Sequence, residues 1–138
     1  MSPPPKRGPD PKTAPPWRIG VRAPFIKVFQ QTYYALADSV RKDRSPSNRE
    51  RCLQAWDDLK ALKQFAFYEC AQTGPDKRFL FLANSKDGEF RMVTIGPWNA
   101  YCFITKEPKR IIWETIVHQS EFRGLSLAAF LRDAADRF

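Results

Sequence analysis

The sequence predicts an α+β domain in which helices pack mainly on one face of an antiparallel sheet. Three observations lead to this class. Apolar residues recur at three- and four-residue steps over two adjacent segments, 25–42 and 47–63. From residue 65 the apolar period changes to two, and short loops separate the apolar runs. A last helical pattern follows Gly124. The expected order is an N-terminal strand, a helical hairpin, a sheet of about four to five strands and a C-terminal helix.

The chain divides by composition into an arm and one domain. Residues 1–16 hold seven of the twelve prolines together with several basic residues, and no large apolar side chain follows Met1. Such a segment cannot bury enough surface to offset its ordering entropy, so we expect a disordered basic arm. The remaining residues, 17–138, are enough for one hydrophobic core and one domain.

The first elements of the domain are a short strand and a helix. Residues 17–22 alternate apolar with polar or small side chains, which is typical of a strand. Pro24 ends this pattern and suits the start of a helix. The helix predicted over 25–42 has one apolar stripe, formed by Ile26, Phe29, Tyr33, Leu36 and Val40.

A second helix is predicted over 47–63. Ser47 and Glu50 have the spacing of a capping box, in which each side chain satisfies a free backbone N–H. The apolar stripe then consists of Cys52, Ala55, Trp56, Leu59 and Leu62. Because few residues separate the two helices, they should form an antiparallel hairpin.

The second half of the chain should form the sheet. Short loops between consecutive strands favour an antiparallel meander. The predicted strands are 65–70, 77–83, 89–95, 98–105 and 109–118. A closing helix is predicted from the stripe Leu127, Phe130, Leu131, Ala134 and Phe138, with Ser126 as its N-cap.

Charge and composition narrow the classes of partner and site. The 23 Lys and Arg outnumber the 15 Asp and Glu, giving a net charge of +8. That favours an anionic partner, first nucleic acid, then an acidic protein segment, then a membrane surface, although a basic protein can also be merely soluble. The three cysteines lie in separate apolar runs and read as core residues. The sequence has no CxxC pair and one histidine, so we expect no metal site. It has no signal-peptide pattern and no apolar run long enough to span a membrane, so we expect a cytoplasmic protein.

Three motifs resemble the RelE/ParE toxin superfamily, including its HigB and related phage-encoded branch. WRIGVRAPFIKVFQQTYYAL is similar to the family's first strand and helix. FRMVTIGPWNAYCFI is similar to its hairpin motif, with Arg91 and Gly96-Pro97-Trp98 in place, and RIIWETIVHQSEF to its last strand, which ends in a functional histidine in several members. The resemblance spans about residues 17–138. Asn99 stands where a basic residue is common, and Gln119 and Ser120 stand where the HigB branch has lysines.

The resemblance implies that His118 takes part in RNA cleavage, with Arg91 stabilising the phosphate charge. A near-neutral imidazole suits proton transfer, and a guanidinium suits the charge on phosphorus. Period-two alternation would place Arg110, Glu114 and His118 on one face of the last strand, so that Glu114 orients the ring. The alternative is a surface histidine at a strand end with an unrelated carboxylate nearby.

Further residues are candidates for holding RNA. Basic side chains on neighbouring strands and beyond His118 can contact phosphates, and one aromatic can stack on a base or serve the core. The same charges can equally be solvated groups at sheet edges. The candidates are Lys77, Arg78, Arg110, Arg123 and Tyr101.

Two functions follow from the resemblance. The first is the toxin of a type II toxin–antitoxin-like system, a metal-independent endoribonuclease that cleaves mRNA on the ribosome and inhibits translation. Its partners would be RNA or the ribosome and an acidic antitoxin protein, with no membrane and no small-molecule cofactor. The alternative is a non-catalytic member, either a ParE-like toxin that targets gyrase or a basic module that binds nucleic acid or protein. His118 favours the first, and Asn99 with the missing lysines favours the second.

Overall fold

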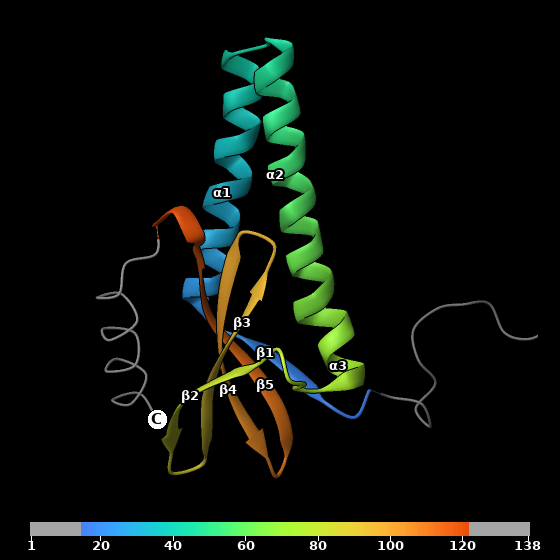
Figure 1. Ribbon diagram of the computed structural model, residues 1–138, viewed down its shortest axis with the longest axis vertical. Helices are drawn as coiled ribbons and strands as arrows, with labels where there is room; N and C mark the ends of the chain where they lie inside the picture. Colours follow the sequence, from blue (N-terminus) through green and yellow to red (C-terminus); the bar gives the residue numbers. More distant parts are fainter. Residues whose placement is uncertain (1–14, 122–138) are drawn as a thin grey trace, which may run out of the picture.

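The computed structural model describes residues 15–121, which form a helical hairpin against one face of a five-stranded sheet (Figure 1). The strands lie in the order β1-β5-β4-β3-β2. The elements are β1 (Arg18–Val21), α1 (Ala23–Lys42), α2 (Pro46–Gln64), the π-helix η2 (Phe65–Glu69), α3 (Cys70–Thr73), β2 (Leu80–Ser85), β3 (Gly88–Ile95), β4 (Trp98–Lys106), β5 (Lys109–His118) and the 3₁₀-helix η3 (Gln119–Glu121). The predicted arm and the predicted C-terminal helix lie largely or wholly outside these residues.

The sheet is mixed, not purely antiparallel as predicted. Strands β2 to β5 form the expected antiparallel meander. The first strand, however, pairs in parallel with the last, with Arg18 opposite Arg110 and Val21 opposite Trp113. The whole hairpin and three strands intervene between β1 and β5, and a connection of that length permits a parallel pair. As a result, β5 is an interior strand with neighbours on both sides.

The helical hairpin confirms the prediction, and its details differ at the N-cap. The second helix begins at Pro46, and its N-cap is Ser45, whose hydroxyl accepts a hydrogen bond from Asn48 N at 3.4 Å. Ser47 is therefore inside the helix and does not form the predicted capping box. Proline suits the first helical position because its missing N–H would have no partner there. On α1, the buried positions are Phe25 and Leu36.

The predicted strand at residues 65–70 is wrong, because this segment continues the second helix through η2 and α3. No glycine or proline interrupts the chain between Pro46 and Gly74, so nothing ends the helix where the aromatic residues begin. The indole Nε1 of Trp113 donates to the carbonyl oxygen of Ala66 at 2.7 Å. Taking that carbonyl out of the regular ladder is compatible with the wider π turn. Helix α3 then stops at Gly74, whose φ of 69° is left-handed.

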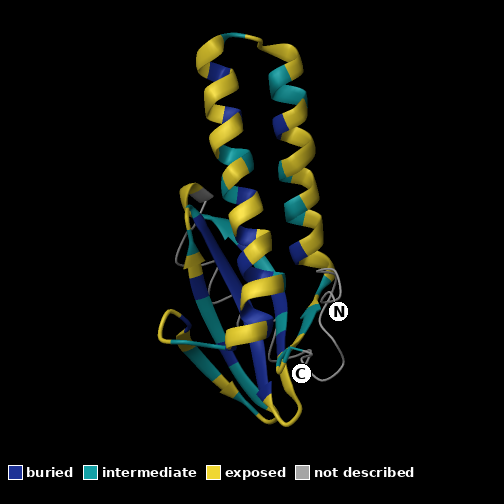
Figure 2. Cartoon of the chain, turned by 90° about the vertical axis from the view of Figure 1, so that its right-hand side faces the viewer, coloured by how far each residue is buried: buried dark blue, intermediate teal, exposed yellow. Residues whose placement is uncertain are grey.

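Two clusters of buried side chains lie on opposite faces of the sheet. The larger lies between the helices and the sheet, on what we call the helix-facing side, and includes Trp113 and Val93. The smaller is on the second face and is centred on Phe90 and Phe103. Figure 2 shows the buried positions concentrated in the sheet and on the inner sides of the helices. No helix within the described residues is long and apolar enough to cross a membrane.

Candidate functional site

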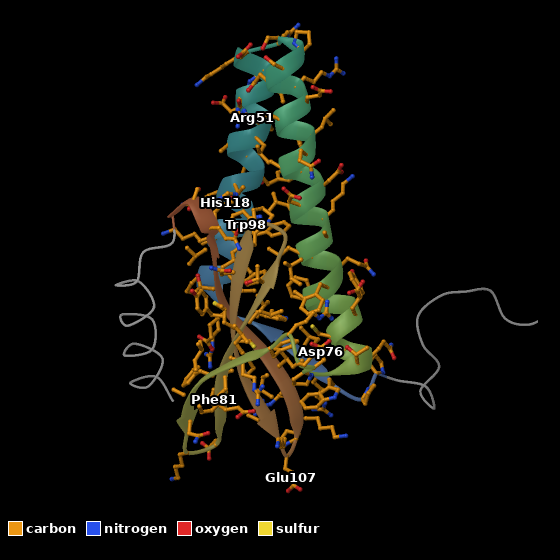
Figure 3. All side chains as sticks on the ribbon, viewed as in Figure 1. Arg51, Asp76, Phe81, Trp98, Glu107 and His118 are labelled. Carbon is orange, nitrogen blue, oxygen red and sulfur yellow. The ribbon has the colours of Figure 1, made fainter. Side chains whose placement is uncertain are left out.

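His118 is the last residue of β5 and lies next to Trp98, at the end of the sheet that is nearer to the hairpin (Figure 3). Trp98 is its partner across the β4–β5 ladder, and the two rings meet edge to face with centroids 5.0 Å apart. Trp98 is buried, whereas His118 is only partly covered. Just beyond the strand, the backbone N–H of Gln119 donates a hydrogen bond to the carbonyl oxygen of Pro97 at 2.7 Å, which joins the chain after β5 to the turn before β4. The sheet therefore holds the imidazole while part of the ring still reaches solvent.

The partner that orients the ring is Ser120. The Nδ1 atom of His118 lies 2.8 Å from the Ser120 hydroxyl and 3.2 Å from the Ser120 backbone N. A backbone N–H can only donate, so Nδ1 must accept, and the proton of the neutral ring resides on Nε2. In the sequence, Ser120 stands out only as a departure from the lysine pattern of the HigB branch. In the fold it decides which imidazole nitrogen meets a ligand.

Glu114 does not orient His118, contrary to the prediction. Its carboxylate is buried and pairs with Arg22, whose Nε lies 3.3 Å from Oε2. The ladder shifts register here, because Tyr101 pairs with Thr115 and the next residue pairs with Trp113. Glu114 is thus the extra residue of a β-bulge, which breaks the alternation that the prediction assumed. Its role in the described structure is to anchor the segment between β1 and α1 to β5.

The bulge also separates Arg110 from His118. Arg110 shares the second face with Ile112, a neighbour of the Phe90–Phe103 cluster. His118 instead follows Ile116, a member of the helix-facing cluster, by two residues. Eight residues of strand at about 3.3 Å each put the two backbone positions roughly 26 Å apart. Arg110 is therefore at the far end of β5 and on the other face.

Arg91 is also displaced from His118. It pairs with Cys102 on β4, whereas His118 pairs with Trp98, four residues back along the same strand. That separation is about 13 Å along the strand direction, with β4 lying in between. The guanidinium is engaged locally, with Nε 2.9 Å from Glu89 Oε1 and Nη1 2.8 Å from the carbonyl oxygen of Phe79. Arg91 braces the β2–β3 hairpin.

Arg78 and Lys77 lie in the connection between α3 and β2, apart from His118. Arg78 forms an ion pair with Asp76 at 2.8 Å, and its guanidinium lies 4.7 Å from the centre of the Phe65 ring. The hydrogen bond from Arg78 lowers the pKa of Asp76. Figure 3 shows Asp76 near the lower end of the second helix, well separated from His118. Lys77 is exposed in the same connection.

Tyr101 and Asn99 point to the second face and are buried. Burial raises the pKa of Tyr101, as desolvation disfavours its phenolate. Asn99 accepts a hydrogen bond from the Thr94 hydroxyl at 2.9 Å across the β3–β4 ladder. Asn99 therefore has a structural role, and an arginine in its place would point away from the helix-facing side where His118 lies. Arg123 lies outside the described residues.

The described site thus consists of one oriented imidazole beside a buried indole. It offers an Nε2–H donor to an anionic oxygen, and proton abstraction by Nε2 would require the ring to change tautomer. Of the described arginines that were expected to gather around it, Arg78 and Arg91 are engaged elsewhere and Arg110 lies at a distance. Among residues 15–121, no group of three or more His, Cys, Asp or Glu side chains is arranged to hold a metal ion.

Comparisons with known proteins find similarity among solved structures. No protein-family model matches the sequence, and no curated protein matches it. Among solved structures, the fold is similar to a chain of the archaeal RelE–RelB complex from Pyrococcus horikoshii, at 12% sequence identity and a TM-score of 0.40. The similarity covers 77% of this chain and 98% of that chain. The function proposed below rests on this chain's own residues and motifs.

Proposed function

We propose that the chain is a RelE/ParE-like toxin that acts on RNA and thereby stops translation. The observation that carries the proposal is His118, a partly exposed imidazole at the end of an interior strand, fixed through Nδ1 by Ser120. Such a ring can donate from Nε2 to a phosphate oxygen and exchange a proton with the leaving oxygen. Its position at the end of the motif RIIWETIVH is the position that the resemblance assigns to the functional histidine.

The partners follow from the same resemblance and from charge. A chain of net charge +8 attracts RNA, and an acidic antitoxin would be attracted to it for the same reason. In the proposed reaction the 2′-hydroxyl oxygen of RNA attacks phosphorus and the bond from phosphorus to the 5′-oxygen breaks. After a change of tautomer that frees Nε2, His118 takes the 2′-hydroxyl proton and returns it to the leaving 5′-oxygen. The proposed cleavage reaction uses no cofactor.

A second candidate, a non-catalytic binding toxin, is favoured by a specific observation. Arg78, Arg91 and Arg110 do not converge on His118, so none of these three guanidinium groups lies where it would stabilise the charge that builds on phosphorus during cleavage. General electrostatic stabilisation is a large part of such catalysis. A toxin that binds gyrase or another protein would not need that convergence.

Induced expression in a bacterial host separates the two candidates. Pulse labelling of protein and DNA synthesis should show loss of translation for a ribonuclease and loss of replication for a gyrase inhibitor. His118→Ala should abolish the translational block, and Lys60→Ala, an exposed site on α2, should retain it. If His118→Ala blocks translation as strongly as the parent, the imidazole is not the proton carrier. Co-expression of a small gene adjacent to this one tests the antitoxin, which should restore growth.

A further inference from the structure

The end of the sheet opposite His118 carries two cross-strand pairs of positive side chains, with the acidic Glu107 in the turn between β4 and β5. In the parallel β1–β5 pair, Arg18 lies directly opposite Arg110. In the turn between β4 and β5, Lys106 lies directly opposite Lys109. All four side chains are exposed. We call these four residues the basic end; Figure 3 marks its position through Glu107, the residue that follows Lys106.

Arg18 and Arg110 share a face as well as a register. Gly20 and Ile112 are the next residues on that face, and a Cβ at Gly20 would lie 3.5 Å from the Ile112 side chain. Side chains two residues apart on a strand point the same way, so both guanidinium groups project from the second face. Neighbouring strands are about 4.8 Å apart, which places two positive charges side by side.

Like charges directly opposite each other destabilise a sheet. Among the described residues, none of the four cations forms an ion pair. Lys109 has a different neighbour, since its Nζ lies 5.8 Å from the centre of the Trp17 ring. Two like-charged cross-strand pairs at one end of a sheet are an arrangement that an external anion would relieve.

The surroundings of the basic end favour a phosphate backbone over an acidic protein. Protein interfaces have apolar and aromatic centres from which charged residues are depleted. The exposed large apolar side chains lie mostly on the helices and on β2, and the one on β1, Val21, is at the end remote from Arg18. Paired guanidinium groups instead match phosphate oxygens, which they bind in a forked geometry.

We propose that the basic end, Arg18 and Arg110 together with Lys106 and Lys109, binds the phosphate backbone of single-stranded RNA at a distance from His118. The choice of RNA as the polyanion rests on the proposed function; the anion-binding surface itself does not. An RNA strand that touched both Arg110 and His118 would have to follow the length of β5, about 26 Å. The basic end is then a tethering contact that is separate from the candidate site of cleavage.

The test measures binding of a fluorescein-labelled 2′-O-methyl RNA 15-mer by anisotropy, over a series of salt concentrations. This probe cannot be cleaved through a 2′-hydroxyl, so binding is measured whether or not the chain is a nuclease. The variant is Arg18→Ala/Arg110→Ala. The matched control is Lys60→Ala/Lys63→Ala on α2, which removes the same charge from two exposed positions.

The double arginine variant should bind about tenfold more weakly, and the slope of log K against log salt should fall by about 1.4, or roughly 0.7 for each lost phosphate contact. The control should change neither quantity by as much. Equal losses in the two variants would show that general charge is responsible and would overturn the proposal. The proposal would also be overturned if the arginine variant bound polyglutamate more weakly than the parent does but bound RNA equally well. Thermal unfolding of both variants confirms that each is folded.

The outcome is separate from that of the proposed function. If expression of the chain does not affect translation but the arginine variant still loses RNA affinity and salt dependence, the basic end stands and the toxin proposal fails. If translation is blocked through His118 but the two variants bind RNA alike, the toxin proposal stands and the basic end fails.

Discussion

The indole Nε1 of Trp113 donates a hydrogen bond to the carbonyl oxygen of Ala66 at 2.7 Å, joining the centre of β5 to the π turn that continues the second helix. Both groups are buried, so neither has water as a substitute partner. The bond thus fixes where the helix layer sits on the sheet. Because Glu114 is the next residue on β5, the same stretch of strand also holds the chain before α1 through Arg22.

Trp113→Phe should therefore destabilise the protein more than an ordinary aromatic replacement. It leaves the Ala66 carbonyl unpaired and removes part of a buried ring, which together cost about 2–4 kcal/mol in the free energy of unfolding. Trp56→Phe, at a partly exposed position between the two helices, should cost less than about 1.5 kcal/mol. Urea denaturation measures both. Equal costs would show that the indole hydrogen bond contributes little.

Removing the partner of the buried Glu114 carboxylate should be costly. The Glu114 side chain has no exposed surface, whereas that of Arg22 is 40% exposed. Arg22→Ala removes the ion pair that Arg22 makes with this buried carboxylate, and we expect a loss of about 3 kcal/mol in unfolding free energy. Arg78→Ala, which breaks the exposed pair with Asp76, should cost less than about 1 kcal/mol and provides the comparison. A small loss for Arg22→Ala in urea denaturation would mean that other groups satisfy Glu114.

The tautomer of His118 can be read directly because the chain has only one histidine. Long-range ¹⁵N–¹H spectra of the protein with its imidazole in the neutral form should show the ring proton on Nε2, because the Ser120 backbone N–H donates to Nδ1. Ser120→Ala keeps this backbone donor and should retain the tautomer. Ser120→Pro removes the donor and should give a mixture. A wild-type spectrum dominated by the Nδ1–H form would contradict the orientation described for the ring.

Stability should fall at alkaline pH because of Cys70. Burial raises the pKa of this thiol from 9.0 to about 12, so the unfolded chain loses its proton at lower pH than the folded one. The contribution of the protonated Cys70 thiol to the free energy of unfolding is fully present below pH 9 and is lost as the pH rises toward 12. At pH 10 the loss is about 1.4 kcal/mol. Urea unfolding between pH 8 and 11 should show a steeper decline for the parent than for Cys70→Ala. If the stability of the parent and of Cys70→Ala declines in parallel, other groups are responsible. One of them is Cys102, because burial also raises the pKa of its thiol.

The elements with one clear period were predictable from the sequence. The bounds of the two helices and of the strands β3, β4 and β5 are close to those predicted from their apolar periods. The stripe predicted for α1 is only partly right, because Leu36 is buried whereas Ile26 and Tyr33 are exposed. The segment 65–70 was predicted wrongly since its alternating aromatics fit a strand as well as a buried helix. The absence of glycine and proline before Gly74 lets the helix continue. The hydrogen bond from Trp113 to the Ala66 carbonyl joins residues 47 positions apart, and no local pattern shows it.

The site was less predictable than the fold, for a similar reason. The expectation that Arg110, Glu114 and His118 share a face assumed an unbroken ladder, and the bulge at Glu114 reverses the alternation between the two ends of β5. The position of His118 at a strand end was predicted correctly. The position of Arg91 relative to it depends on register across several strands, which the sequence does not specify. Arg78 was predicted on the strand 77–83 but lies in the connection before β2.

The parallel pairing of β1 with β5 constrains the order in which the chain can fold as it is made. Arg18 meets Arg110 only after the hairpin and the antiparallel strands between them have been synthesised. Closing so long a loop carries a large entropic cost, which is reduced once the intervening elements are already compact. We therefore expect β1 to dock last, onto an edge of β5 that stays open until then. During that interval a nascent chain exposes an unpaired strand edge, and crowded neighbouring copies could pair with it.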